Sequence, residues 1–218
     1  MNLIEQARSY VMDILRKCET YPYHNPSHTV KVYDRATYIA LAEWVEGEDL
    51  EDLQIACLFH DTGFTEQYSK NEFIGVKIAQ HWLESHKHPK LRIDKIEGVI
   101  MATVLFSKPK THLQEIIQDA DLDNIGTKEE FFYSQRYLSE LRTIGNIDIS
   151  DCSYWQFVYT LLTKFKFHTK TARKERHDQL MRDVEHMEKF INMIGCTLPE
   201  PDSHRHARRT IESLEFSA

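Results

Sequence analysis

Histidine and aspartate residues gather in three short segments of this chain, each beside an apolar stretch. The first is YHNPSH at 23–28, the second is the pair His60 and Asp61, and the third is DADLD at 119–123. Divalent transition ions accept imidazole nitrogens and carboxylate oxygens together as ligands. These residue types, grouped in this way, predict a metal centre with nitrogen and oxygen ligands.

The first segment combines the start of a helix with two histidines. Asn25 is a favoured N-cap residue and Pro26 is favoured at the first helical position, so a helix begins here. His28 then lies in the first turn and His24 just before it. A helix N-terminus, with its free N–H groups, suits a bound anion such as phosphate. Two surface histidines beside a plain helix cap would give the same pattern.

The second segment closes an apolar helix. Adjacent helical residues point about 100° apart, so His60 and Asp61 reach a common ion only if it lies beyond the helix end. The alternative is an ordinary helix terminus, where histidine complements the dipole and Gly63 ends the helix.

The third segment places three carboxylates after the apolar run that begins at Leu113. Charges this close repel one another, and a nearby cation would relieve the repulsion. An acidic loop with Asx turns is the alternative. Asp121 lies between Ala120 and Leu122, so we expect it, rather than Asp119 or Asp123, to point inward.

Helices must position these segments, because apolar residues recur at helical spacing nearly throughout the chain. Strand-like alternation is nearly absent, and glycine and proline are scarce, with 7 and 6 residues. We therefore predict an all-α, single-domain bundle of about eight or nine helices. Ser69 and Glu72 fit a capping box for one of them. The expected helices cover about 4–18, 26–42, 50–59, 70–83, 93–103, 113–120, 128–143, 152–166 and 171–195.

Length and composition exclude several classes of protein. The 218 residues suit one domain, at 1–196, with a charged C-terminal tail at 197–218. The net charge of −7 argues against non-specific nucleic-acid binding. No apolar run approaches the roughly 20 residues that span a bilayer, and Glu5 and Arg8 interrupt any signal-peptide pattern. We expect a soluble, cytoplasmic protein without membrane contact, and a homodimer is compatible with this composition.

The four cysteines form no CxxC motif. They could make two disulfides, but nothing marks a secreted chain, and we expect a reducing compartment.

Taken together, the three segments resemble the HD superfamily of metal-dependent phosphohydrolases, which has the pattern H…HD…D on an all-helical fold. Here the pattern is His28, then His60 with Asp61, then Asp121. YHNPSH is similar to the YHNxxH stretch of the cyclic nucleotide phosphodiesterases in this superfamily. DADLDNIG is similar to the closing motif of small bacterial-type HD phosphohydrolases. The resemblance covers about residues 20–175 and implies a helical bundle of the HD-domain type.

The chain departs from parts of this superfamily at two places. The phosphodiesterases have a further histidine shortly after the HD pair, where this chain continues with TGF at 62–64. Other branches add histidines that hold a second metal. His81, His86 and His88 are candidates, although they also suit the solvent-exposed end of a helix. We therefore expect a single ion.

The resemblance implies a function for each segment. A divalent ion (iron, manganese, nickel, zinc or magnesium) would be bound by four ligands: His28, His60, Asp61 and Asp121. His24 would be the general acid, and Asp119 would orient a ligand or the attacking water. A metal-activated water would hydrolyse a small phosphorylated substrate of nucleotide type.

Basic residues supply candidate phosphate contacts. The run from Lys164 to Arg176 is rich in them, and a solvated helix face is the alternative for most of the run. Three residues are the substrate-binding candidates: Lys108, His168 and Arg173.

Two other functions stay open. A di-iron oxygenase of the same fold would need additional ligands, and its metal content would distinguish it. A non-catalytic nucleotide-binding HD module would usually have lost a ligand. A purely structural helical protein would leave the four-residue pattern to coincidence.

Overall fold

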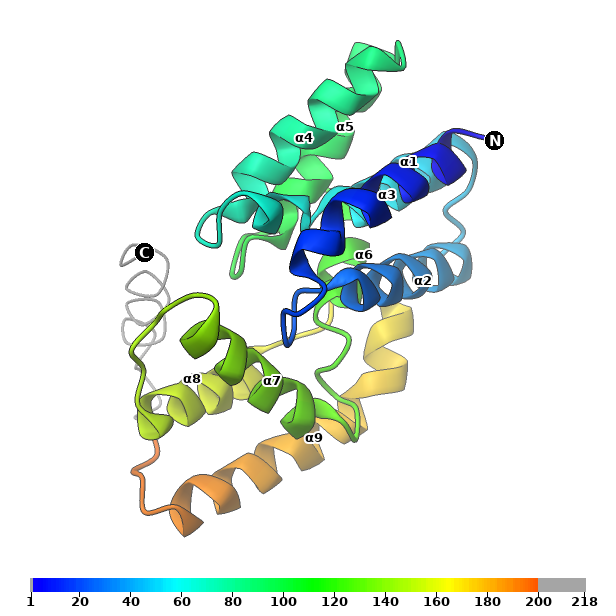
Figure 1. Ribbon diagram of the computed structural model, residues 1–218. Coiled ribbons are helices and arrows are strands. Elements are labelled where there is room, and N and C mark those ends of the chain that lie inside the picture. The colour runs from blue at the N-terminus through cyan, green and yellow to red at the C-terminus, as the bar shows by residue number, and fades with distance from the viewer. Residues whose placement is uncertain (1, 200–218) are drawn as a thin grey trace. The chain divides into compact units, whose positions relative to one another are not determined.

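The computed structural model describes residues 2–199, which form nine α-helices and three short 3₁₀-helices (Figure 1). No strand occurs in this part of the chain, so the predicted all-α class is confirmed. The elements are α1 (Leu3–Ile14), η1 (Leu15–Cys18), α2 (Pro26–Ala42), α3 (Gly47–Phe59), η2 (Thr62–Thr65), α4 (Asn71–Ser85), α5 (Lys90–Ile100), η3 (Met101–Thr103), α6 (His112–Asp121), α7 (Glu130–Thr143), α8 (Asp151–Lys164) and α9 (Lys170–Met193).

Side-chain caps explain where several helices begin. The Asn25 side chain accepts hydrogen bonds from the N–H groups of Ser27 and His28, and Pro26 is the first residue of α2, as predicted. Thr111 caps α6 and Ser150 caps α8 in the same way.

The predicted capping box at Ser69 and Glu72 is wrong. Helix α4 begins at Asn71, after Lys70 in the left-handed conformation (φ 56°), and no side chain caps it. The left-handed residue turns the chain abruptly into the helix, which leaves Ser69 outside the N-cap position. The segment between the expected helices at 50–59 and 70–83 also contains the 3₁₀-helix η2, which the sequence did not predict.

The chain divides into two compact units. The first comprises Met1–Asp123 with His168–Ala172, and the second comprises Asn124–Phe167 with Arg173–Ala218. The sequence predicted one domain at 1–196, and the structure divides that range between the two units. Of the predicted tail at 197–218, residues 200–218 lie outside the described part of the chain.

Helix α3 is the centre of the first unit. Every residue from Leu53 to Phe59 except Gln54 is completely buried, because α3 packs against α1, α2 and α5. A helix that is apolar on all sides has to be enclosed by others. The residues that directly follow α3, His60 and Asp61, therefore lie within the first unit and not at its surface.

One buried acid also joins α3 to α5. Asp52 is completely buried, and its carboxylate accepts from Arg92 Nε at 2.7 Å and lies 2.8 Å from Lys95 Nζ. Two cations around one enclosed carboxylate offset the cost of removing its charge from water.

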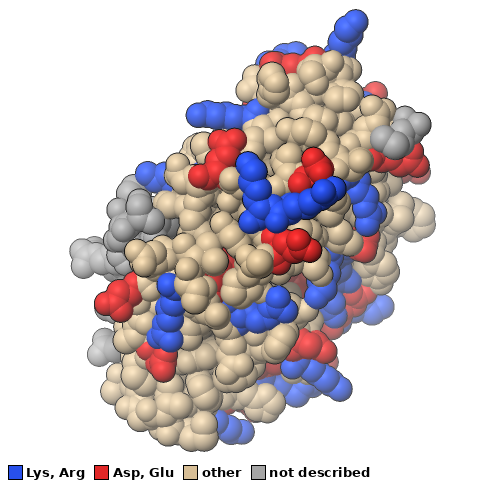
Figure 2. Space-filling model, viewed as in Figure 1, with Lys and Arg blue, Asp and Glu red and all other residues tan. Residues whose placement is uncertain are grey.

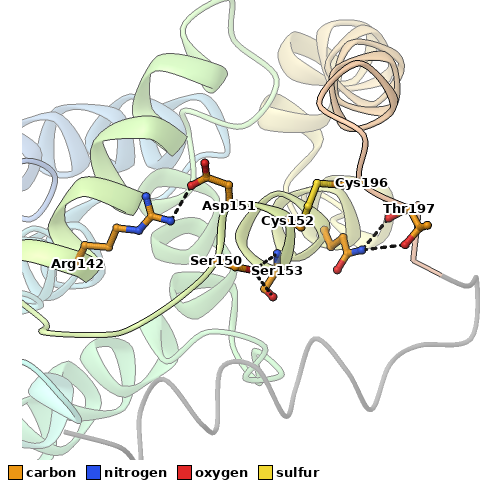
Figure 3. Close-up of a disulfide and its surroundings, with 8 residues drawn as sticks. Arg142, Ser150, Asp151, Cys152, Ser153, Cys196 and Thr197 are labelled. Atoms are coloured by element: carbon orange, nitrogen blue, oxygen red, sulfur yellow. Dashed lines mark hydrogen bonds and ion pairs between the residues drawn. A yellow bond between two sulfur atoms is a disulfide. The ribbon is translucent and has the colours of Figure 1, made fainter.

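Aromatic packing and a disulfide organise the second unit. Phe131 of α7, Trp155 of α8 and Phe190 of α9 pack with ring centroids 4.9–5.1 Å apart. Cys152, near the start of α8, forms a disulfide with Cys196, just after α9 (Figure 3). The sequence predicted no particular pairing. The other two cysteines, Cys18 and Cys57, are buried and form no disulfide.

Acidic and basic side chains alternate over the face shown in Figure 2, where lysines and arginines lie among aspartates and glutamates. None of the described helices is long and apolar enough to cross a membrane.

Glu130 of α7 is 4% exposed, and its Oε1 accepts a hydrogen bond from the Ser134 hydroxyl at 2.5 Å. Burial and, secondarily, the charge of Asp183 raise the pKa of Glu130 to about 7, against the opposing effect of the Ser134 hydrogen bond.

The raised pKa makes the stability of the protein depend on pH. Between pH 4.5, the ordinary glutamate value, and pH 7, the unfolded chain releases this proton while the folded protein retains it, so stability falls as pH rises. Glu130→Gln keeps an acceptor for Ser134 and removes the charge. We expect it to stabilise the protein at pH 8 by about 2–3 kcal/mol and hardly at all near pH 4.5.

Thermal denaturation at several pH values measures this difference. Glu129→Gln, at the exposed neighbouring position, is the control and should show no such pH trend. An equal shift for Glu130→Gln at every pH would contradict the prediction.

Candidate metal centre

The four predicted metal ligands meet at one place in the first unit. His28 Nε2 lies 3.0 Å from Asp121 Oδ1 and 3.5 Å from Asp61 Oδ2. His60 Nε2 lies 3.1 Å from Asp61 Oδ2 and 3.5 Å from Asp121 Oδ1. Two nitrogens and two oxygens thus alternate around a common centre. His28, His60 and Asp121 can place their ligand atoms within 4.8 Å of one another.

Three helices bring these side chains together. His28 lies in the first turn of α2, where Asn25 fixes the helix start. His60 and Asp61 directly follow α3, and Asp121 is the last residue of α6. Helices α2, α3 and α6 pack against one another, so the cluster forms where the start of one helix meets the ends of two others.

The hydrogen bonding around His60 fits a bound cation. Its Nδ1 lies 2.8 Å from the Cys57 carbonyl oxygen, which can only accept, so Nδ1 carries a proton. In a neutral imidazole, Nε2 is then an acceptor directed at two carboxylates, which also accept. His60 Nε2 and Asp61 Oδ2 are both buried without a hydrogen-bond partner. A metal ion at the common centre would satisfy both atoms.

The electrostatics keep the carboxylates ionised. Burial opposes the charged forms of the whole cluster, but the two histidines outweigh it and hold the pKa values of Asp61 and Asp121 below the ordinary range. For the same reason Asp61 and Asp121 raise the pKa of His60 despite its burial. Ionised carboxylates are the form that a metal requires.

Gly63 allows the backbone after Asp61 to pack closely against α4. A Cβ at position 63 would lie 1.8 Å from the carbonyl oxygen of Asn71, so only glycine fits there. Gly75 of α4 approaches the backbone of the HD pair in turn, because its Cβ would lie 3.1 Å from the His60 carbonyl oxygen. These contacts fix the position of His60 and Asp61.

His24 lies beside the cluster. Its ring stacks on Phe64 with centroids 4.3 Å apart, and its centroid is 5.7 Å from that of His28. Burial raises the pKa of Asp61, but His60 and then the charge of His24 lower it by more. Phe64 was not among the predicted site residues. Its position three residues after Asp61 was the available signal, but an apolar residue there reads equally well as core.

The start of α2 offers fewer donors to an anion than the sequence suggested. Asn25 Oδ1 accepts from the N–H groups of Ser27 and His28 at 3.0 and 3.2 Å. A phosphate at this end would therefore depend on the cluster and on side chains rather than on these two groups.

Asp119 does not join the cluster. Its carboxylate accepts the backbone N–H groups of His168, at 2.9 and 3.1 Å, and Thr169, at 2.8 Å. It is completely buried, so the expectation that Asp121 alone of the three would point inward is wrong. These contacts fix the chain just before α9, and they give no support to the catalytic role predicted for Asp119. Asp123 forms an ion pair with Arg35 at 2.7 Å.

The remaining candidates lie elsewhere. Lys108 is exposed in the loop before α6, and Arg173 is exposed on the second unit, so their phosphate contacts stay predictions, as does that of half-buried His168. At the end of α4, His81 is exposed, His86 stacks on Trp82, and His88 lies 3.9 Å from Asp52.

An all-helical fold in which His, His-Asp and Asp meet is the arrangement of the HD domain. Residues 27–123 match the family model of the HD domain, and this range contains all four clustered residues. The resemblance to the HD superfamily is therefore confirmed for residues 27–123.

Solved structures show the same fold. A predicted HD superfamily hydrolase from an uncultured Thermotogales bacterium is 24% identical, with a TM-score of 0.55 over 89% of this chain and 100% of that one. YpgQ of Bacillus subtilis, solved in complex with ADP, is 23% identical, with a TM-score of 0.60 over 86% and 94%. The Lin1889 protein of Listeria innocua is 24% identical, with a TM-score of 0.58 over 88% and 98%. A comparison with curated proteins gives no significant match.

A metal that binds only the folded protein stabilises it by mass action. We expect a chelator to lower the melting temperature of the wild-type protein by about 5–10 °C, the effect of an ion present at about 100 times its Kd. Asp61→Ala should melt at the same temperature with and without chelator.

Metal analysis by mass spectrometry, alongside the melting curves, checks the result. Asp13→Ala, at an exposed position on α1, is the control and should keep the wild-type response. If the chelator shifts Asp61→Ala as much as the wild type, Asp61 is not a ligand.

Proposed function

We propose that this protein is a metal-dependent phosphohydrolase that acts on a small phosphorylated substrate of nucleotide type. One observation carries the proposal: two imidazole nitrogens and two carboxylate oxygens alternate around one centre, and buried members of the set lack hydrogen-bond partners. His28, His60, Asp61 and Asp121 would hold the ion. Iron, manganese, nickel, zinc and magnesium are all compatible with nitrogen and oxygen ligands.

When bound, such an ion lowers the pKa of a coordinated water and polarises a phosphoryl oxygen. Four protein ligands would leave such an ion accessible to water or substrate. The ion would also supply positive charge where a phosphate must bind, although the chain as a whole has a net charge of −7.

His24 is the residue that we assign to proton transfer. Its stacking on Phe64 holds the ring next to His28, so it can donate to an oxygen of a substrate bound at the cluster. Loss of the leaving group from phosphorus requires a proton when that group is an alkoxide, and an imidazole suits this role near neutral pH.

The nucleotide class of substrate is supported by the similarity in fold to YpgQ, whose structure contains ADP. The di-iron alternative has less support. Within residues 2–199, one group of histidines and acids can hold a metal ion, and His86 and His88 contact other groups.

The test is a panel of phosphate compounds incubated with metal-loaded, full-length protein. Hydrolysis of at least one of ADP, ATP, cyclic AMP and p-nitrophenyl phosphate, to phosphate, pyrophosphate, AMP or p-nitrophenol, should occur in proportion to metal content. His28→Ala should lose both metal and turnover, whereas His81→Ala, at an exposed position on α4, should keep both. Tight nucleotide binding without turnover, in protein with full metal content, would instead establish a non-catalytic binding module.

His24→Ala separates proton transfer from metal binding. We expect it to keep the metal and the fold and to lose about 10²–10⁴-fold in kcat on a substrate with a poor leaving group. The loss should be smaller with p-nitrophenyl phosphate, whose leaving group needs little protonation. Steady-state kinetics with metal analysis give the comparison. Metal loss equal to that of His28→Ala would make His24 a ligand, and unchanged kcat on the poor substrate would exclude it from the reaction.

A further inference from the structure

The second unit contains a cavity of about 510 Å³ between the start of α7 and the middle of α9. Its lining belongs entirely to this unit, whereas the candidate metal ligands belong to the first. None of the residues that we assign to the proposed phosphohydrolase activity lines this cavity.

Two buried acids line the cavity. Glu130 and Asp183 are 4% and 6% exposed, and they are close enough for the charge of Asp183 to affect Glu130. Asp183 Oδ1 accepts from Gln179 Nε2 at 2.7 Å, and the backbone of Gly126 is close enough to counteract part of the rise in the Asp183 pKa that burial causes. Asp183 Oδ2 is buried and has no hydrogen-bond partner. An enclosed carboxylate oxygen without a donor costs free energy that a cationic ligand would recover.

Gly126 makes the approach to Asp183 possible. It has a φ of +71°, and a Cβ there would lie 2.6 Å from the backbone oxygen of Arg176 in α9. The chain before α7 can therefore lie directly against α9, which brings its backbone close to the acid.

The rest of the lining indicates what kind of cation fits. Phe131, Met187 and Phe190 give the cavity apolar and aromatic walls, which suit a ligand with a carbon body and attract a cation through the ring faces. A metal ion fits less well. Glu130, Asp183 and His186 all line the cavity, but they do not form a metal-binding group like that of the first unit.

Two basic residues of the lining disfavour a ligand with a second positive charge. Lys128 and Arg182 also line the cavity and are both exposed. A second ammonium group beside them would meet like charges.

From this arrangement we infer that the second unit binds a small organic monoamine, with its ammonium group at Asp183 and Glu130 and its apolar body against Phe131 and Phe190. Benzylamine is the probe, because it joins one ammonium group to one aromatic ring. Benzyl alcohol is the neutral control compound. The second control compound is p-xylylenediamine, which carries a second ammonium group.

The experiment is a titration of full-length protein that carries ¹³C-methyl methionine, at constant ionic strength. The Met187 methyl resonance, assigned with Met187→Leu, should shift and saturate with benzylamine, while that of Met12 in the first unit should not move. Benzyl alcohol and the diamine should bind more weakly. No saturable shift at Met187, or equal affinity for the alcohol, would overturn the inference.

A matched pair of variants tests the acid itself. Asp183→Asn preserves size and should weaken benzylamine binding about 10–100-fold, the usual effect of losing a charge-assisted hydrogen bond. Asp178→Asn, at an exposed position on the same helix, should bind as the wild type does. Wild-type affinity in Asp183→Asn, with the Met187 shift intact, would remove Asp183 from the site. If Asp183→Asn does not fold, the alcohol and diamine titrations of the wild type still decide the inference.

Discussion

The burial of the C-terminal half of α3 is the constraint on which the first unit depends. Because residues 53–59 are almost all apolar, α1, α2 and α5 have to enclose this half of the helix. The chain that leaves the C-terminal end of α3 is consequently still inside the unit, so the next two residues, His60 and Asp61, cannot reach water. Their partners come from the start of α2 and the end of α6. The close approach of Gly63 and Gly75 then completes the enclosure from the side of α4.

Three enclosed acids of the described residues, Asp52, Asp119 and Glu130, are accommodated in three different ways. Asp52 lies between two cationic side chains, and Asp119 accepts backbone N–H groups from a distant segment. Glu130 has neither kind of partner beyond one hydroxyl, so its pKa rises and it takes up a proton more readily. The first two arrangements tie helices together, whereas the third leaves a group whose charge depends on its surroundings. Acids of the third kind are the ones that a ligand can influence most.

The sequence predicted those features of the fold that depend on residues close together in the chain. Helical periodicity located all nine α-helices of residues 2–199, and Asn25 with Pro26 located the start of α2, because caps and amphipathic faces are local properties. The grouping of His28, His60, Asp61 and Asp121 followed from the resemblance. The role of Asp119 did not follow, since its partners lie about 50 residues away and are backbone groups that any sequence provides. The predicted capping box was wrong because Lys70 adopts a left-handed conformation, which no local sequence pattern indicated. The sequence did not single out Asp183 either, because it is one of many charged residues along α9.

The disulfide between Cys152 and Cys196 has a topological consequence. It joins two points that are 44 residues apart and closes into one covalent ring all of α8 after its first residue, the connection to α9 and α9 itself. A protease that cut the backbone once inside this ring would not separate the two fragments. The nicked chain would migrate as a single species on a denaturing gel without reductant, and would separate into two bands only after the bridge was reduced.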